Sequence, residues 1–133
     1  MIKMLGDQIT DLKGKVTGQR VLDAEGPTIE TSISSTGSAK GVRINEILTF
    51  VGKPSSPGVL HGKGQGVFSA ESGWATWTGE GIGRMIPPGI KWRGAIFLTS
   101  ATGKLEFLNN MVSIFEAEID MEGNFSEKSW EWK

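Results

Sequence analysis

The chain has 133 residues, and its 14 basic and 15 acidic side chains leave a formal net charge of -1. A nucleic-acid binder needs a concentrated basic surface, so this scattered and balanced charge excludes nucleic acid as an expected partner. The absence of cysteine excludes disulfides and thiolate chemistry and favours a reducing, cytoplasmic location. No apolar run approaches the roughly 20 residues that cross a membrane, so we expect one soluble domain over 1–133 and no membrane partner.

Turn-forming residues divide the chain into eight segments rich in Thr, Val and Ile. We expect strands over 15–23, 28–35, 40–51, 59–69, 74–84, 90–100, 111–120 and 125–132, and one helical turn over 104–109. Evenly spaced strands with short connections favour a closed meander, because closure removes exposed sheet edges. The sequence therefore predicts an all-β fold, a closed antiparallel eight-stranded meander barrel.

Two of the early strands each carry an ionisable residue on an apolar face. Alternation places Arg20 with Val16 and Leu22, and Glu46 with Ile44 and its apolar neighbours. An isolated buried charge is very costly, so we expect Arg20 and Glu46 to point into the barrel as an internal ion pair. Such a pair serves structure as well as function. Glu46 is the candidate catalytic acid or base.

Glycine occupies every second position in two consecutive strands, at Gly62, Gly64 and Gly66 and again at Gly79, Gly81 and Gly83. A connection of two or four residues within 70–73 would place Gly64 opposite Gly79 and Trp77 opposite Gly66. An aromatic ring over a strand glycine covers the missing side chain, which gives the cluster a complete structural interpretation. The alternative is a ligand or backbone lying close to a bare strand face.

The tryptophans are candidate walls of a ligand site. Five tryptophans and no tyrosine favour apolar or stacking contacts with a hydrophobic small molecule. Trp74, Trp77 and Trp92 are the expected ligand-binding aromatics, with Arg20 and Glu46 as polar partners. Trp74 shares a strand face with Glu80 and Arg84, and the sequence leaves open whether that face is barrel lining or surface. Two further tryptophans, Trp130 and Trp132, indicate that the last strand closes the barrel.

Other polar patterns favour no recognised catalytic template. Glu116, Glu118 and Asp120 share one strand face, which is more typical of a solvated outer surface than of a metal or acid/base site. His61 is the single histidine and is expected to face outward, so neither a histidine metal site nor a serine triad can be assembled. We expect no metal and no cofactor.

The last two-thirds of the chain carries a series of glycine-rich strand and turn motifs: Gly62-Lys-Gly64-Gln-Gly66, Trp77-Thr-Gly79-Glu-Gly81-Ile-Gly83, Arg93-Gly94, Thr102-Gly103-Lys104-Leu105 and Leu108-Asn109. In these motifs the chain resembles the small barrels of the allene oxide cyclase family and their prokaryotic relatives. It implies a calycin-like barrel, commonly a homo-oligomer, whose interior accepts a hydrophobic small molecule. The catalytic set of the plant cyclases does not map residue by residue onto this sequence, so the resemblance carries over fold and not activity.

Three functions are compatible with these patterns. The first is a binding module that holds an apolar ligand inside the barrel, with Glu46 or Arg20 orienting its polar end. The second is a cofactor-free isomerase or cyclase in which Glu46 donates or accepts a proton in a water-poor cavity. The third is a structural or assembly module whose barrel is packed solid. The volume of the interior separates the third from the other two.

Overall fold

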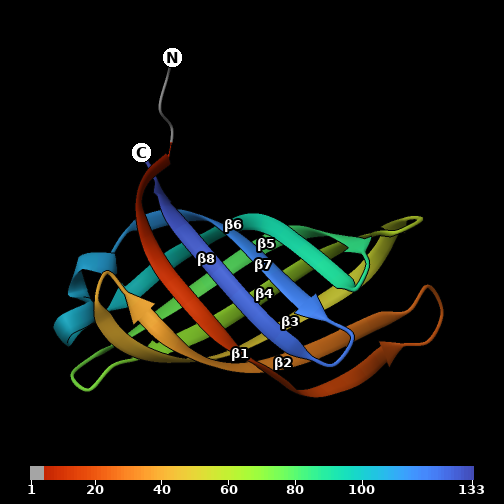
Figure 1. The fold of residues 1–133 in the computed structure, drawn as a ribbon, viewed down its shortest axis with the longest axis horizontal. Coiled ribbons are helices and arrows are strands. Elements are labelled where there is room, and N and C mark those ends of the chain that lie inside the picture. The colour runs from red at the N-terminus through yellow and green to blue at the C-terminus, as the bar shows by residue number, and fades with distance from the viewer. Residues whose placement is uncertain (1–4) are drawn as a thin grey trace.

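Eight antiparallel strands follow one another around a closed barrel (Figure 1). The computed structural model describes residues 5–133. Each strand pairs with the next in the chain, and the last pairs with the first. The strands are β1 (Leu5–Asp23), β2 (Thr28–Ala39), β3 (Val42–Ser56), β4 (Val59–Ser69), β5 (Trp74–Ile86), β6 (Gly89–Ala101), β7 (Met111–Asp120) and β8 (Asn124–Trp132). The all-β, closed antiparallel meander predicted from the sequence is confirmed.

The predicted strand boundaries agree best for β4 and β7, which have the predicted ends. The largest difference is at β1, which begins at Leu5 rather than at residue 15. The additional residues are strand because they pair with β8, and Ile9 and Leu12 lie buried in the barrel. The first strand therefore takes part in closing the barrel along most of β8.

The two ends of the barrel differ. One end is closed by the short helix η1 (Gly103–Leu108), drawn at the left of Figure 1. Leu105 and Leu108 of this helix are fully buried, and the Asn109 side chain both donates to and accepts from the Ala101 backbone at 2.8 Å. At the other end, the β1–β2 and β3–β4 hairpins extend away from the barrel (Figure 1). Residues of both hairpins line a pocket at this second end.

The glycine strands pair as the turn geometry predicts. β4 and β5 are joined through residues 70–73, and this connection places Gly64 opposite Gly79 and Gly62 opposite Gly81. Trp77 lies opposite Gly66, as expected. A Cβ atom on Gly66 would come within 2.5 Å of the Trp77 indole, so only glycine fits beneath this ring. The structural interpretation of this glycine and tryptophan pair is confirmed.

The expected position of Arg20 is wrong. Its side chain is 70% exposed and forms a surface ion pair with Glu30 at 3.3 Å. The reason is a β-bulge between Val16 and Gly18, where β1 has one residue more than β2. An extra residue reverses the alternation of the strand, so positions beyond the bulge face the side opposite to that predicted from Val16. Arg20 and Glu46 therefore do not form an internal pair.

The last strand closes the barrel as predicted, and its inward face is the one that carries Glu127 and Ser129. Glu127 and Ser129 are buried, whereas Trp132 is 52% exposed on the outside. On the neighbouring β7, the predicted outer face is confirmed, because Glu116 and Glu118 are exposed and pair with basic side chains of β6. These acids are a surface feature.

Candidate functional site: the mouth and interior of the barrel

The open end of the barrel contains a pocket of about 510 Å³. It is lined by Val16, Gln19, Pro27, Ile29, Thr31, Phe50, Gly52, Pro54, Ser56, Pro57, Gly58, Val59, Leu60, Met85, Ile90, Trp92 and Ile119. None of these side chains carries a charge. Gln19 and Thr31, two of the few polar ones, are hydrogen-bonded to each other at 3.2 Å. We call this space the mouth pocket; its volume lies within the roughly 300–1,000 Å³ typical of small-molecule sites.

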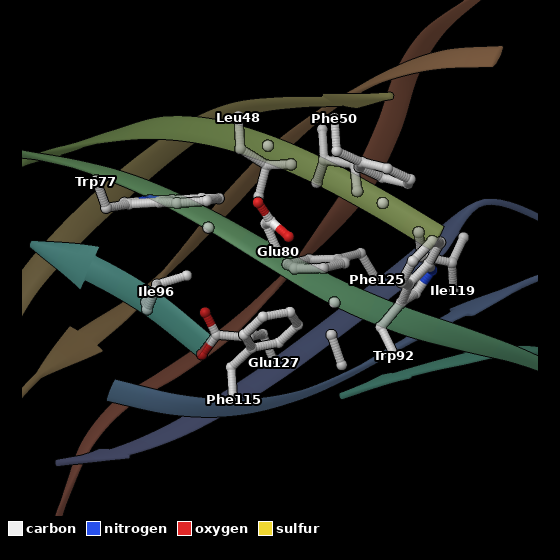
Figure 2. A pocket seen from close by; sticks show the side chains of 16 residues that line it. Leu48, Phe50, Trp77, Glu80, Trp92, Ile96, Phe115, Ile119, Phe125 and Glu127 are labelled. Carbon is white, nitrogen blue, oxygen red and sulfur yellow. The ribbon is translucent and has the colours of Figure 1, made fainter. Parts of the chain in front are cut away.

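A second, smaller space lies deeper in the barrel and has a volume of about 70 Å³. Figure 2 shows Trp77 and Trp92 on opposite sides of it, with Phe115 and Glu127 between them. We call this space the inner cavity. It has room for a few non-hydrogen atoms but not for a whole drug-sized ligand. The interior thus contains two unequal spaces rather than one large one.

Three residues border both spaces: Phe50, Trp92 and Ile119. The rings of Phe50 and Trp92 meet edge to face, with centroids 5.1 Å apart and planes at 69°. This arrangement is the favoured geometry for an aromatic pair. Phe50 and Trp92 therefore lie between the mouth pocket and the inner cavity.

The bare glycine faces explain how such large rings fit in a narrow barrel. A Cβ atom on Gly62 would lie 2.7 Å from the Trp92 ring, and one on Gly83 would lie 2.9 Å from it. Trp92 therefore lies flat on the glycines of β4 and β5. The facing pair Gly64 and Gly79 borders the inner cavity instead. The glycines thus have both roles that the sequence suggested: some of them pack against the Trp92 ring, and others border a cavity beside it.

Glu46 is buried on β3, with 1% of its surface exposed. Ser35, its cross-strand neighbour on β2, donates a hydrogen bond to one carboxylate oxygen at 3.1 Å. The Trp77 indole N–H donates to the other at 2.9 Å. Burial, reinforced by repulsion from Glu127, raises the pKa of Glu46 from 4.5 to about 8, although the two hydrogen bonds act in the opposite direction. Glu46 holds the Trp77 ring in place.

Glu127 on β8 is the interior carboxyl that the sequence analysis missed. It borders the inner cavity and accepts a hydrogen bond of 2.6 Å from Thr10. Since Thr10 donates to Glu127, the Ser129 hydroxyl donates to Thr10. Burial raises the pKa of Glu127 to about 7, opposed by the Thr10 bond. Because the two glutamates repel each other when both are charged, the pair titrates as one unit.

A usable signal for Glu127 exists in the sequence. Alternation in β8 puts either Glu127 and Ser129 or Lys128 and Trp130 inside the barrel. A buried side chain is favoured in its uncharged form. A glutamate becomes uncharged near neutral pH by binding a proton, whereas a lysine becomes uncharged only by losing one. Phe125, which is buried and shares the face of Glu127, points the same way.

The structure separates the five predicted ligand-binding residues. Trp77 and Trp92 border the inner cavity. Glu46 is buried beside Trp77 but does not border either space. Trp74 lies on the outside and is 44% exposed, which answers the question that the sequence left open about its face, and Arg20 is also on the surface.

Among residues 5–133, no group of three His, Cys, Asp or Glu side chains is arranged to hold a metal ion. No helix within the same range is both long and apolar enough to span a membrane. The chain matches no protein-family model, no curated protein and no solved structure.

Proposed function

We propose that this protein binds an apolar small molecule in the mouth pocket of its barrel. The observation that carries the proposal is a space of about 510 Å³ whose wall is apolar over most of its surface and contains no charged side chain. Transfer of an apolar ligand into such a wall is favourable by about 25 cal/mol for each Å² removed from water. The open mouth argues against a barrel that is packed solid.

The resemblance to the allene oxide cyclase family belongs to this proposal. A closed eight-stranded meander supports it. An assembly of several copies and a cytoplasmic location stay predictions of the sequence.

A cofactor-free isomerase or cyclase is the second candidate, and one observation favours it. Glu127 borders the inner cavity and has a pKa raised to about 7, so it can hold or release a proton near neutral pH. Glu46 is less suited to that role, because both of its carboxylate oxygens are engaged by Ser35 and Trp77.

The proposal is tested by titrating the protein with Nile red, a neutral dye whose fluorescence rises in apolar surroundings. Leu60→Arg places a charge in the mouth pocket, and Ile47→Arg places the same charge on the outer wall, where Ile47 is 68% exposed. We expect Leu60→Arg to weaken binding at least about tenfold and Ile47→Arg to leave it within about twofold. Equal affinities in two folded variants would overturn the proposal. Should Leu60→Arg fail to fold, Met85→Arg offers a more exposed position in the same pocket.

A further inference from the structure

Resting on the proposed function, we propose that Trp92 is a gate between the mouth pocket and the inner cavity, and that the ligand is a neutral, elongated apolar molecule whose leading hydroxyl or carbonyl passes the gate to reach Glu127. The chemical class follows from the charges of the two walls. The gate follows from a comparison of the two buried tryptophans.

Trp77 of β5 and Trp92 of β6 both pack against glycines of β4 but are held differently. The Trp77 N–H donates to Glu46, which fixes its ring. The Trp92 N–H is buried and has no hydrogen-bond partner among residues 5–133. A buried donor without a partner destabilises the position it occupies, so the closed position of Trp92 is less favourable than that of Trp77.

Trp92 is buried but borders the free volume of the mouth pocket. Its ring rests on Gly62 and Gly83, which present no side chains to interlock with it, and its neighbour Phe50 contacts it by an edge. Since Trp92 borders both spaces, displacement of its ring joins the mouth pocket to the inner cavity. The joined space would extend from the mouth pocket to Glu127, which suits an elongated molecule.

The charges of the walls select a neutral ligand. The mouth pocket has no charged side chain, and the wall of the inner cavity includes no basic one. Of the two acids in that wall, Glu80 directs its carboxylate to the surface, where it lies 3.7 Å from Lys63. A carboxylate or phosphate carried inward would be buried beside Glu127 without a counter-charge, which is strongly unfavourable.

Glu127 is the group that the leading oxygen can meet. One of its carboxyl oxygens accepts from Thr10, the other has no side-chain hydrogen bond among residues 5–133, and the residue borders the cavity of about 70 Å³. A cavity of this size admits a hydroxyl or carbonyl with its first carbons, while the rest of the chain lies in the mouth pocket. The two volumes thus match a small polar head and a larger apolar tail.

The experiment uses 1-octanol and octanoate, which share a chain length and differ in charge, with the full-length protein carrying fluorotryptophan. At pH 8 we expect octanol to bind at least about tenfold more tightly than octanoate. The ¹⁹F signals of Trp92 and Trp77 should shift together as octanol saturates the site. The signals of Trp74 and Trp132 on the outer wall serve as controls and should stay in place.

Octanoate binding as tightly as octanol would overturn the neutral class. A shift of Trp92 without Trp77 would place octanol in the mouth pocket alone, which would overturn the gate and leave the proposed function standing. No binding of octanol or Nile red would overturn both. As a second variant, Glu127→Leu should lower the affinity for octanol at least about fivefold. The affinity for Nile red, which is too large for the inner cavity, should stay unchanged. Glu127→Gln should bind octanol as the native protein does. Unchanged octanol affinity in Glu127→Leu would remove Glu127 from the site.

Discussion

The buried carboxyl pair predicts that the protein loses stability as pH rises from 4.5 to 8, and Glu46→Gln is the variant that isolates the cause. Glu46 has its ordinary pKa of 4.5 in the unfolded chain and about 8 in the barrel. Between these values the folded state holds a proton that the unfolded state has released. Stability is therefore fully present below pH 4.5 and falls until pH passes about 8.

The magnitude follows from the same two values. Each tenfold change in a protonation equilibrium corresponds to about 1.4 kcal/mol, so the raised pKa of Glu46 corresponds to at most about 5 kcal/mol across this range, part of which arises from its repulsion by Glu127. Glutamine has the shape of the neutral acid and can both accept from Trp77 and donate to Ser35. We expect Glu46→Gln to lie within about 1 kcal/mol of the native protein at pH 5 and to be more stable by several kcal/mol at pH 8.

The assay is urea denaturation at pH 5 and pH 8, followed by tryptophan fluorescence. Glu116→Gln is the matched control, because Glu116 is exposed on β7 and pairs weakly with Arg93 at 4.0 Å. It should leave the pH dependence unchanged within about 0.5 kcal/mol. Equal stability of the native protein at both pH values would refute the reasoning. A Glu46→Gln variant that is less stable than the native protein by the same amount at pH 5 and pH 8 would also refute it.

Further substitutions test the packing of the barrel and the surface position of Arg20. Gly66→Ala should destabilise the protein by about 1–3 kcal/mol, because its methyl group would overlap the fixed Trp77 ring. Gly18→Ala has open space around it and should change stability by less than about 0.5 kcal/mol. Thermal denaturation distinguishes the two variants. Asn109→Ala should cost about 1–3 kcal/mol, since it leaves buried backbone groups beside the closing helix without partners, and a neutral result in urea denaturation would contradict that role. Arg20→Ala should change stability by less than about 1 kcal/mol, and a larger loss would argue against its surface position.

The architecture could be predicted from the sequence because its signals are local and repeated. Alternating glycines on β4 and β5, with four residues between the strands, determine which positions face each other. The pairing of Gly64 with Gly79 follows from that count. Regular turn residues then define the number of strands, and a closed meander is the simplest arrangement that leaves no edge exposed.

The candidate site could be predicted only in part, because two features depend on more than one strand. The bulge at Val16 and Gly18 reverses the face of Arg20, and no residue pattern within β1 alone shows where the partner strand has one residue fewer. Glu127 was missed because alternation alone separates the two faces of β8 without showing which of them turns inward. Its burial depends on Thr10, which lies on β1 at the other end of the chain and is brought beside it when the barrel closes.

The central claim is that the mouth pocket holds a neutral apolar ligand, and a crystal structure with 8-bromo-1-octanol tests it most directly. The account predicts an anomalous bromine peak within the mouth pocket, between Leu60 and Ile90, with the chain running inward past Trp92. Bromine peaks on the outer wall alone, or none in the mouth pocket at saturating concentration, would contradict it.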